Sequence, residues 1–129
     1  MEKIVKFWLD SSKEDLEITK DLFKACRYNY SMFMCQQSIE KFLKGIIIIL
    51  TKDHPPYVHD LVRLAQATKF KISPEIETDL RLITSYYIKA RYEADRFDSA
   101  IFNKENARIT INRAEEIVKW FTKKANLKI

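Results

Sequence analysis

The chain has 129 residues and a formal net charge of +5, from 23 basic and 18 acidic side chains. This length predicts one domain, residues 1–129, that can bury a hydrophobic core without disulfides or a structural metal. With one glycine and three prolines, the composition favours helix and excludes a glycine-rich phosphate loop. No apolar run approaches the ~20 residues that cross a bilayer, and the N-terminus lacks the apolar core of a signal peptide. We therefore expect an intracellular, cytoplasmic protein with no membrane segment.

The first two predicted helices form an antiparallel pair. Residues 4–26 follow helical spacing, although the polar stretch 10–15 could interrupt them. A turn follows, in which Asn29 could adopt the left-handed conformation. The second helix is predicted over residues 30–50. Its end, 46–50, is apolar on all sides, so either a dimer contact or the following loop must cover it.

Two prolines, Pro55 and Pro56, end the second helix. A short third helix is predicted over residues 60–68. Ser73 and Pro74 are typical of a helix start, with serine as the N-cap and proline as the first helical residue. They predict the beginning of the fourth helix.

The last third of the chain contains one ambiguous segment. Residues 91–103 are either an extension of the fourth helix or a loop. Asn103 is placed to cap the last helix, whose apolar residues recur at three- and four-residue spacing. The predicted fold is an all-α, up-and-down antiparallel bundle of four long helices plus one short helix.

The second helix carries a polar patch that differs from an ordinary solvated face. On the side opposite its apolar stripe, four polar side chains fall within an arc of roughly 100°: Gln37, Glu40, Lys41 and Lys44. Met34 lies one turn before this patch and Ile48 one turn after it. From Met34 through Gln37, Lys41 and Lys44 to Ile48, the residues are alternately three and four positions apart. This spacing is typical of a helix face that packs against another helix. It predicts either a covered polar site or solvated polar residues with exposed apolar neighbours.

A second polar cluster follows the double proline. Asp60 is well placed to cap the third helix and to hold His59. Capping alone explains Asp60, whereas a histidine in a loop is often only exposed.

A third cluster spans residues 86–96, with three tyrosines and two arginines near a helix end. Tyrosine rings can stack on a base, and guanidinium groups bind phosphate in a bidentate manner. The alternative interpretation places Tyr87 in the core and pairs Arg91 with Glu93 or Asp95.

Metal binding and catalysis by familiar motifs are not expected. Cys26, Cys35, His54 and His59 lack the spacing of zinc ligands, so no metal and no cofactor is predicted. Both cysteines are expected to be reduced and buried. The densest basic stretch, 119–128, is typical of the solvated side of a last helix, so RNA is not an expected partner.

Taken together, these residues resemble the HEPN domain family over nearly the whole chain. The resemblance rests on several short motifs: Trp8-Leu9, Asp15-Leu16, Gln36 to Lys44, His59-Asp60-Leu61, Tyr86-Tyr87 and Arg91-Tyr92. It implies a helical bundle related to the substrate-binding C-terminal domain of some antibiotic nucleotidyltransferases. It also implies a homodimer, often encoded beside a small nucleotidyltransferase in a toxin–antitoxin-like pair.

Some members of that family are RNA-cleaving toxins, but this chain departs from their pattern. They use an arginine followed four to six residues later by a histidine, paired across a dimer. No histidine follows Arg91, so the group expected to transfer protons near neutral pH is missing and no catalytic residue is predicted. A second departure, Glu93-Ala94 where relatives commonly have proline, favours continuation of the fourth helix.

Three functional hypotheses follow. The leading one is a non-catalytic, dimeric, nucleotide-binding and interaction module that works with a small nucleotidyltransferase. The second is a metal-independent RNase toxin acting through a dimer cleft. The third is a purely structural homodimer or partner-binding bundle.

The leading hypothesis assigns roles to seven residues. Gln37, Lys41 and Lys44 would contact polar and phosphate groups, and Glu40 would hold the lysines in place. His59 and Arg91 would approach the same cleft. Tyr92 would stack on a base. The third hypothesis assigns the contact with a second copy or another protein to three further residues, Met34, Ile47 and Ile48.

Overall fold

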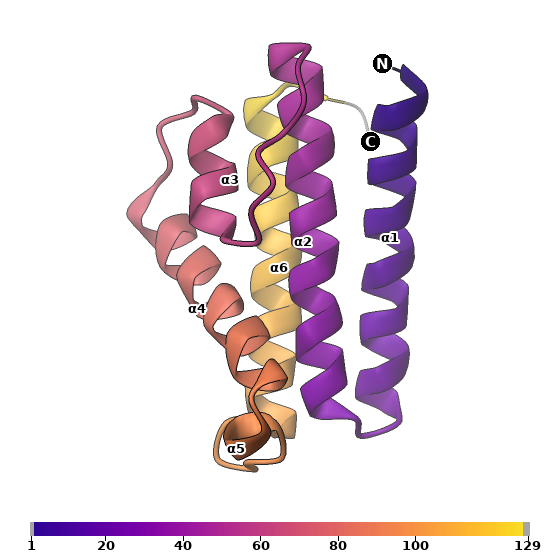
Figure 1. Ribbon diagram of the computed structural model, residues 1–129, viewed down its shortest axis with the longest axis vertical. Coiled ribbons are helices and arrows are strands. Elements are labelled where there is room, and N and C mark those ends of the chain that lie inside the picture. Colours follow the sequence, from indigo (N-terminus) through magenta and orange to yellow (C-terminus); the bar gives the residue numbers. More distant parts are fainter. Residues whose placement is uncertain (1, 128–129) are drawn as a thin grey trace.

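The computed structural model describes residues 2–127. Within them the chain forms only helices, in the order α1 (Glu2–Lys24), α2 (Tyr28–Thr51), α3 (Leu61–Ala67), α4 (Pro74–Arg91), α5 (Glu93–Arg96) and α6 (Lys104–Lys124). The four long helices alternate in direction, and α3 packs against α2 and α4, lying above the start of α4 in the view of Figure 1. The predicted all-α bundle of four long helices and one short helix is confirmed, with the one-turn α5 in addition.

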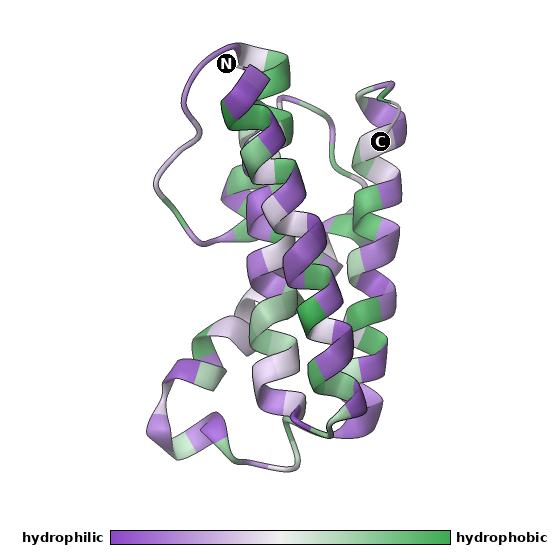
Figure 2. Ribbon diagram, turned by 90° about the vertical axis from the view of Figure 1, so that its right-hand side faces the viewer, coloured by the Kyte–Doolittle hydropathy of each residue, from purple (hydrophilic) through white to green (hydrophobic). Residues whose placement is uncertain are grey.

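Helix α2 is the central element of the bundle. It packs against α1, α3, α4 and α6, and Ile39, Leu43 and Ile46 on it are fully buried. The long helices carry hydrophobic and hydrophilic residues along their whole length (Figure 2), as amphipathic helices around a shared core do. No helix within the described residues is long and apolar enough to cross a membrane.

Three predicted helix starts are confirmed by their caps. The Asp60 carboxylate accepts hydrogen bonds from two backbone N–H groups at the start of α3. The Ser73 hydroxyl and the Asn103 side-chain oxygen cap α4 and α6 in the same way. Each cap satisfies a backbone donor that has no partner inside its helix.

The connection between α1 and α2 differs from the prediction. Helix α1 runs without a break and ends at Lys24, and the left-handed residue after it is Cys26, with φ of 61°, rather than Asn29. The Arg27 N–H donates to the Leu22 carbonyl at 2.8 Å and the Cys26 N–H to the Phe23 carbonyl at 3.0 Å, which is a Schellman cap. This cap leaves Cys26 exposed, so the expectation that it is buried is wrong.

The expected continuation of α4 beyond Arg91 is also wrong. Tyr92 is extended, with ψ of 130°, and α5 begins at the next residue. The chain then turns back and buries Phe102 in a small cluster with Met32 and Ala107. A straight continuation of α4 would leave Phe102 without these contacts, which accounts for the break in the helix.

The apolar end of α2 is covered from within the chain. Ile47 and Ile48 are each 2% exposed. Ile48 lies beneath the N-terminal part of α1 on one side and the double-proline loop on the other. Neither side chain has surface to offer a partner, so we correct the expectation that Ile47 and Ile48 form a dimer contact. Met34 is half-buried, and its contact with a partner stays a prediction.

Candidate functional site

Glu40 is the centre of a buried polar network. It is 5% exposed, and its Oε1 accepts hydrogen bonds from His59 Nδ1 at 2.9 Å and from Gln36 Nε2 at 3.2 Å. Its Oε2 accepts from Lys44 Nζ at 2.9 Å. Gln36, Glu40 and Lys44 are four residues apart, so they lie on one face of α2. Both carboxylate oxygens are therefore occupied by donors from the chain itself.

These donors keep the Glu40 carboxylate ionised. Burial alone would raise the pKa of Glu40, but the hydrogen bonds from His59, Lys44 and Gln36, with the positive charge of Lys44, outweigh burial and lower it. The Lys44 ammonium also lies 5.3 Å from the centre of the Trp8 ring. The buried charge is thus compensated within the bundle.

Gln36 is a site residue that the sequence analysis did not select. It is fully buried, and its Nε2 also donates to the His59 backbone carbonyl at 2.8 Å. Its Oε1 accepts from Gln37 Nε2 at 2.8 Å. Helix α2 therefore holds both the imidazole and the backbone of His59. The four-residue spacing from Gln36 to Glu40 was the signal that could have identified it.

Lys41 faces a different neighbour. Its Nζ lies 2.7 Å from Asp15 Oδ2, on α1. Glu40 therefore holds Lys44, as predicted, but not Lys41. Because both ammonium groups have a carboxylate partner inside the chain, this part of α2 presents little free positive charge to a ligand.

His59 and Arg91 both contact Tyr87. Its ring is 6% exposed and stacks on Phe33, with ring centres 5.2 Å apart. The His59 ring centre lies 5.4 Å from it. Arg91 Nη1 donates to the Tyr87 hydroxyl at 3.3 Å, and Cζ lies 5.3 Å from the ring centre. Tyr87 is in the core, but Arg91 contacts it rather than Glu93 or Asp95.

A hollow of about 410 Å³ lies between the start of α2 and the end of α4. We call it the arginine hollow, and its lining residues are Asn29, Tyr30, Phe33, Ala90, Arg91 and Arg96. Among the ion pairs within residues 2–127, none joins a carboxylate to either guanidinium group. Tyr30 is 48% exposed. The arginine hollow combines positive charge with aromatic surface.

Tyr92 lies near Arg91 but outside the arginine hollow. It is 61% exposed and lines a smaller hollow of about 290 Å³ with Ile88 and Arg91. Of the seven residues predicted to bind a nucleotide, only Arg91 lines the arginine hollow. Sequence reasoning noted Arg96 within the tyrosine–arginine cluster but did not select it, and it missed Tyr30 and Phe33.

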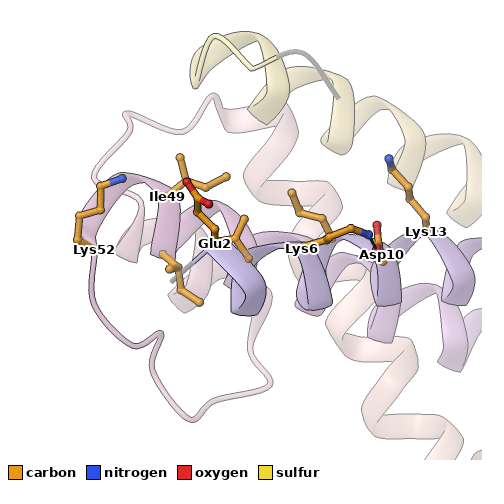
Figure 3. A pocket seen from close by; sticks show the side chains of 9 residues that line it. Glu2, Lys6, Asp10, Lys13, Ile49 and Lys52 are labelled. Atoms are coloured by element: carbon orange, nitrogen blue, oxygen red, sulfur yellow. Dashed lines mark hydrogen bonds and ion pairs between the residues drawn. The ribbon is translucent and has the colours of Figure 1, made fainter.

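A separate hollow of about 380 Å³ lies between the first half of α1 and the end of α2. In Figure 3, Lys52 and Lys13 lie toward its two ends, and the ion-paired Lys6 and Asp10 lie between them. Ile48 is its one lining residue among those predicted for the site. No group of three or more potential metal ligands occurs in the described part of the chain.

The signature of the HEPN domain matches residues 5–125. Two solved structures share the fold. The protein TT1696 from Thermus thermophilus is similar with a TM-score of 0.81 and 18% identity, over 93% of this chain and 97% of that one. ST0689, an archaeal HEPN homologue, has a TM-score of 0.73 and 19% identity, over 94% of this chain and 97% of that one. No curated protein matches the sequence.

Proposed function

The chain belongs to the HEPN domain family, and on that premise we propose that it is a non-catalytic module that binds an anionic, nucleotide-like ligand. The ligand occupies the arginine hollow. The observation that carries the proposal is that Arg91 and Arg96 line one hollow and that neither forms an ion pair within the described residues. Guanidinium groups without carboxylate partners are suited to bidentate binding of phosphate.

The rest of the hollow suits the organic part of a nucleotide. Tyr30 and Phe33 contribute aromatic surface from α2, on which a base can stack. Asn29 contributes an amide whose Nδ2 donates to the Arg96 backbone carbonyl. The amide oxygen accepts from the Tyr30 backbone N–H at 2.9 Å, and its second lone pair can accept a hydrogen bond from a ligand.

The phosphate contacts are now assigned to Arg91 and Arg96 instead of to the polar patch on α2. Lys41 and Lys44 are each paired with a carboxylate, and freeing either ammonium group would leave a buried carboxylate without its partner. Gln37, Glu40, Lys41 and Lys44 therefore receive no ligand contact. His59 and Tyr92 lie beside the hollow rather than in it.

Apart from Tyr30, the residues that line the arginine hollow cannot exchange a proton near neutral pH, which favours binding over catalysis. Arginine stays protonated throughout the physiological pH range, and asparagine, phenylalanine and alanine do not titrate. Arg96 follows Arg91 by five residues, at a spacing where the family's ribonucleases would carry a histidine. A permanently charged guanidinium at that place binds phosphate but does not exchange protons near neutral pH.

A homodimer and a small nucleotidyltransferase partner, as in a toxin–antitoxin-like pair, belong to the same proposal. Ile88, Tyr92 and Phe97 are exposed near the arginine hollow, and exposed apolar side chains of this kind are enriched at protein interfaces. Sedimentation at high concentration tests self-association. A single 15.4 kDa species would contradict the dimer, and the ligand site would be unaffected.

A thermal-shift series with ATP, GTP, CTP and UTP tests the ligand. A nucleotide that binds the folded state at a large excess over its dissociation constant should raise the melting temperature by several degrees. The matched variants are Arg91→Ala and, as control, Arg63→Ala, which removes an exposed arginine on α3. If no nucleotide shifts the wild-type melting temperature, the ligand proposal fails.

A further inference from the structure

We infer that Glu40, His59 and Tyr87 are positioning residues for the arginine hollow. None of the three lines it, yet together they hold two side chains that do, Phe33 and Arg91. This inference rests on the proposed function, because it takes the arginine hollow as the ligand site.

Tyr87 contacts both lining side chains from behind. Its ring stacks on Phe33 with an interplanar angle of 20°, and its hydroxyl accepts a hydrogen bond from Arg91 Nη1. An exposed arginine has many rotamers, and a ligand must otherwise order that side chain when it binds. Since Tyr87 is buried, it fixes the guanidinium group before any ligand arrives.

His59 supports Tyr87 and is itself held by α2. Its side chain is 60% exposed, so it would be free to rotate without specific bonds. Glu40 holds the imidazole Nδ1 at 2.9 Å, and Gln36 holds the backbone carbonyl at 2.8 Å. The imidazole is therefore kept against the Tyr87 ring, at 5.4 Å between ring centres.

These contacts join two of the helices that line the hollow, α2 and α4. Glu40 and Phe33 lie on α2, whereas Tyr87 and Arg91 lie on α4. The contacts that run from Glu40 to His59 and from His59 to Tyr87 thus hold the end of α4 against α2. A weaker link in that chain should loosen Arg91 although no ligand contact is lost. Mutations that act on a binding site through such intermediate contacts change ligand affinity by a factor of roughly 2 to 30.

The experiment follows the Arg91 side chain by its Nε–Hε signal in NMR spectra of the ligand-free, full-length protein. The test variants are His59→Ala and Tyr87→Phe, and His54→Ala is the control because His54 is an exposed histidine elsewhere in the same connection. His59→Phe keeps a ring against Tyr87 but cannot donate to Glu40. ATP affinity of each variant is measured by calorimetry.

We expect His59→Ala and Tyr87→Phe to shift or broaden the Arg91 signal and to weaken ATP binding roughly 2- to 30-fold. His59→Phe should restore part of both effects, and His54→Ala should change neither. Ile117→Val, a core substitution in α6, controls for a general loss of stability and should leave the Arg91 signal in place. An Arg91 signal that is unchanged in both test variants would overturn the inference.

The two proposals can fail separately. If the wild-type protein binds none of the four nucleotides, the proposed ligand fails, while the Arg91 signal still shows whether His59 and Tyr87 position that side chain. If ATP binds with equal affinity to wild type, His59→Ala and Tyr87→Phe, the proposed function stands and the positioning role is wrong.

Discussion

The His59 imidazole Nδ1 lies 2.9 Å from Oε1 of the buried Glu40 carboxylate. A connecting segment is thereby attached to the central helix of the bundle by a charged group that solvent scarcely reaches. The other carboxylate oxygen of Glu40 accepts a hydrogen bond from Lys44, four residues further along the same helix. The polar patch on α2 thus serves the packing of the chain, and the ligand is expected elsewhere.

The first prediction concerns the stability of this network. Glu40→Ala leaves the Lys44 ammonium, whose side chain is 11% exposed, without its carboxylate. Removing one partner of a buried ion pair costs about 3–5 kcal/mol. Urea denaturation should therefore give a lower free energy of unfolding by about that amount. The matched control is Glu115→Ala, which breaks the partly exposed pair with Lys20 and should cost at most ~1 kcal/mol. Equal losses in the two variants would contradict a special role for Glu40.

The second prediction is a pH dependence of stability. The pKa of Glu40 is lower in the folded chain than that of an ordinary glutamate, because hydrogen bonds from His59, Lys44 and Gln36 outweigh the effect of burial. A lowered pKa contributes stability above the unfolded value, about 4.3 for glutamate, and this stability is lost as the pH falls through the folded pKa. Glu40→Gln lacks that contribution. The stability difference between wild type and Glu40→Gln should therefore narrow as the pH falls below about 4, and a difference that stays constant would count against the assignment.

The third prediction concerns the arginines. Arg91→Ala and Arg96→Ala each remove a charged donor from the arginine hollow. A hydrogen bond to a charged group contributes about 1.5–3 kcal/mol, so each variant should bind nucleotide roughly 10- to 150-fold more weakly. Arg91→Lys keeps the charge but loses the planar fork and should recover only part of the affinity. Arg63→Ala should bind as wild type does. If Arg63→Ala weakens nucleotide binding as much as Arg91→Ala does, the loss reflects the lower net charge of the protein and not a specific site.

The fourth prediction concerns the close approach of α1 and α2 at Gly45. A Cβ atom there would lie 2.9 Å from Leu9 Cδ2 and 3.1 Å from Leu9 Cγ. Alanine gains up to ~1 kcal/mol of helix propensity over glycine, but overpacking costs about 1–3 kcal/mol. Gly45→Ala should therefore be destabilising in the wild type and stabilising in a Leu9→Ala background. A double-mutant cycle by chemical denaturation measures this coupling, and additive effects would show that Leu9 is not the obstacle.

Much of the fold could be predicted because its signals are local. Ser73 and Asn103 mark helix starts through hydrogen bonds to backbone groups within three residues of them. The apolar stripes at helical spacing define which faces are buried. The left-handed turn was misplaced because Cys26 carries no sequence preference for that conformation, whereas Asn29 does.

The candidate site was harder to predict because it depends on distant segments. Gln36 and Gln37 are adjacent on α2, and Gln36 is the buried one because the His59 carbonyl packs against it from another part of the chain. Lys41 pairs with Asp15 on α1, which the periodicity of α2 alone does not reveal. Arg96 joins Arg91 because the chain turns at Tyr92, where no glycine or proline marks the break.

A ligand site in the arginine hollow is tested most directly by an ATP titration of the isotope-labelled protein, in which the backbone amide signals are followed. We expect the largest shifts at residues 29–33 and 90–96, around the arginine hollow, and in Arg91→Ala the same shifts should require roughly 10- to 150-fold more ATP. Shifts concentrated at residues 37–44 instead, and unchanged in Arg91→Ala at the same ATP concentration, would place the ligand on the polar face of α2 and contradict a site in the arginine hollow.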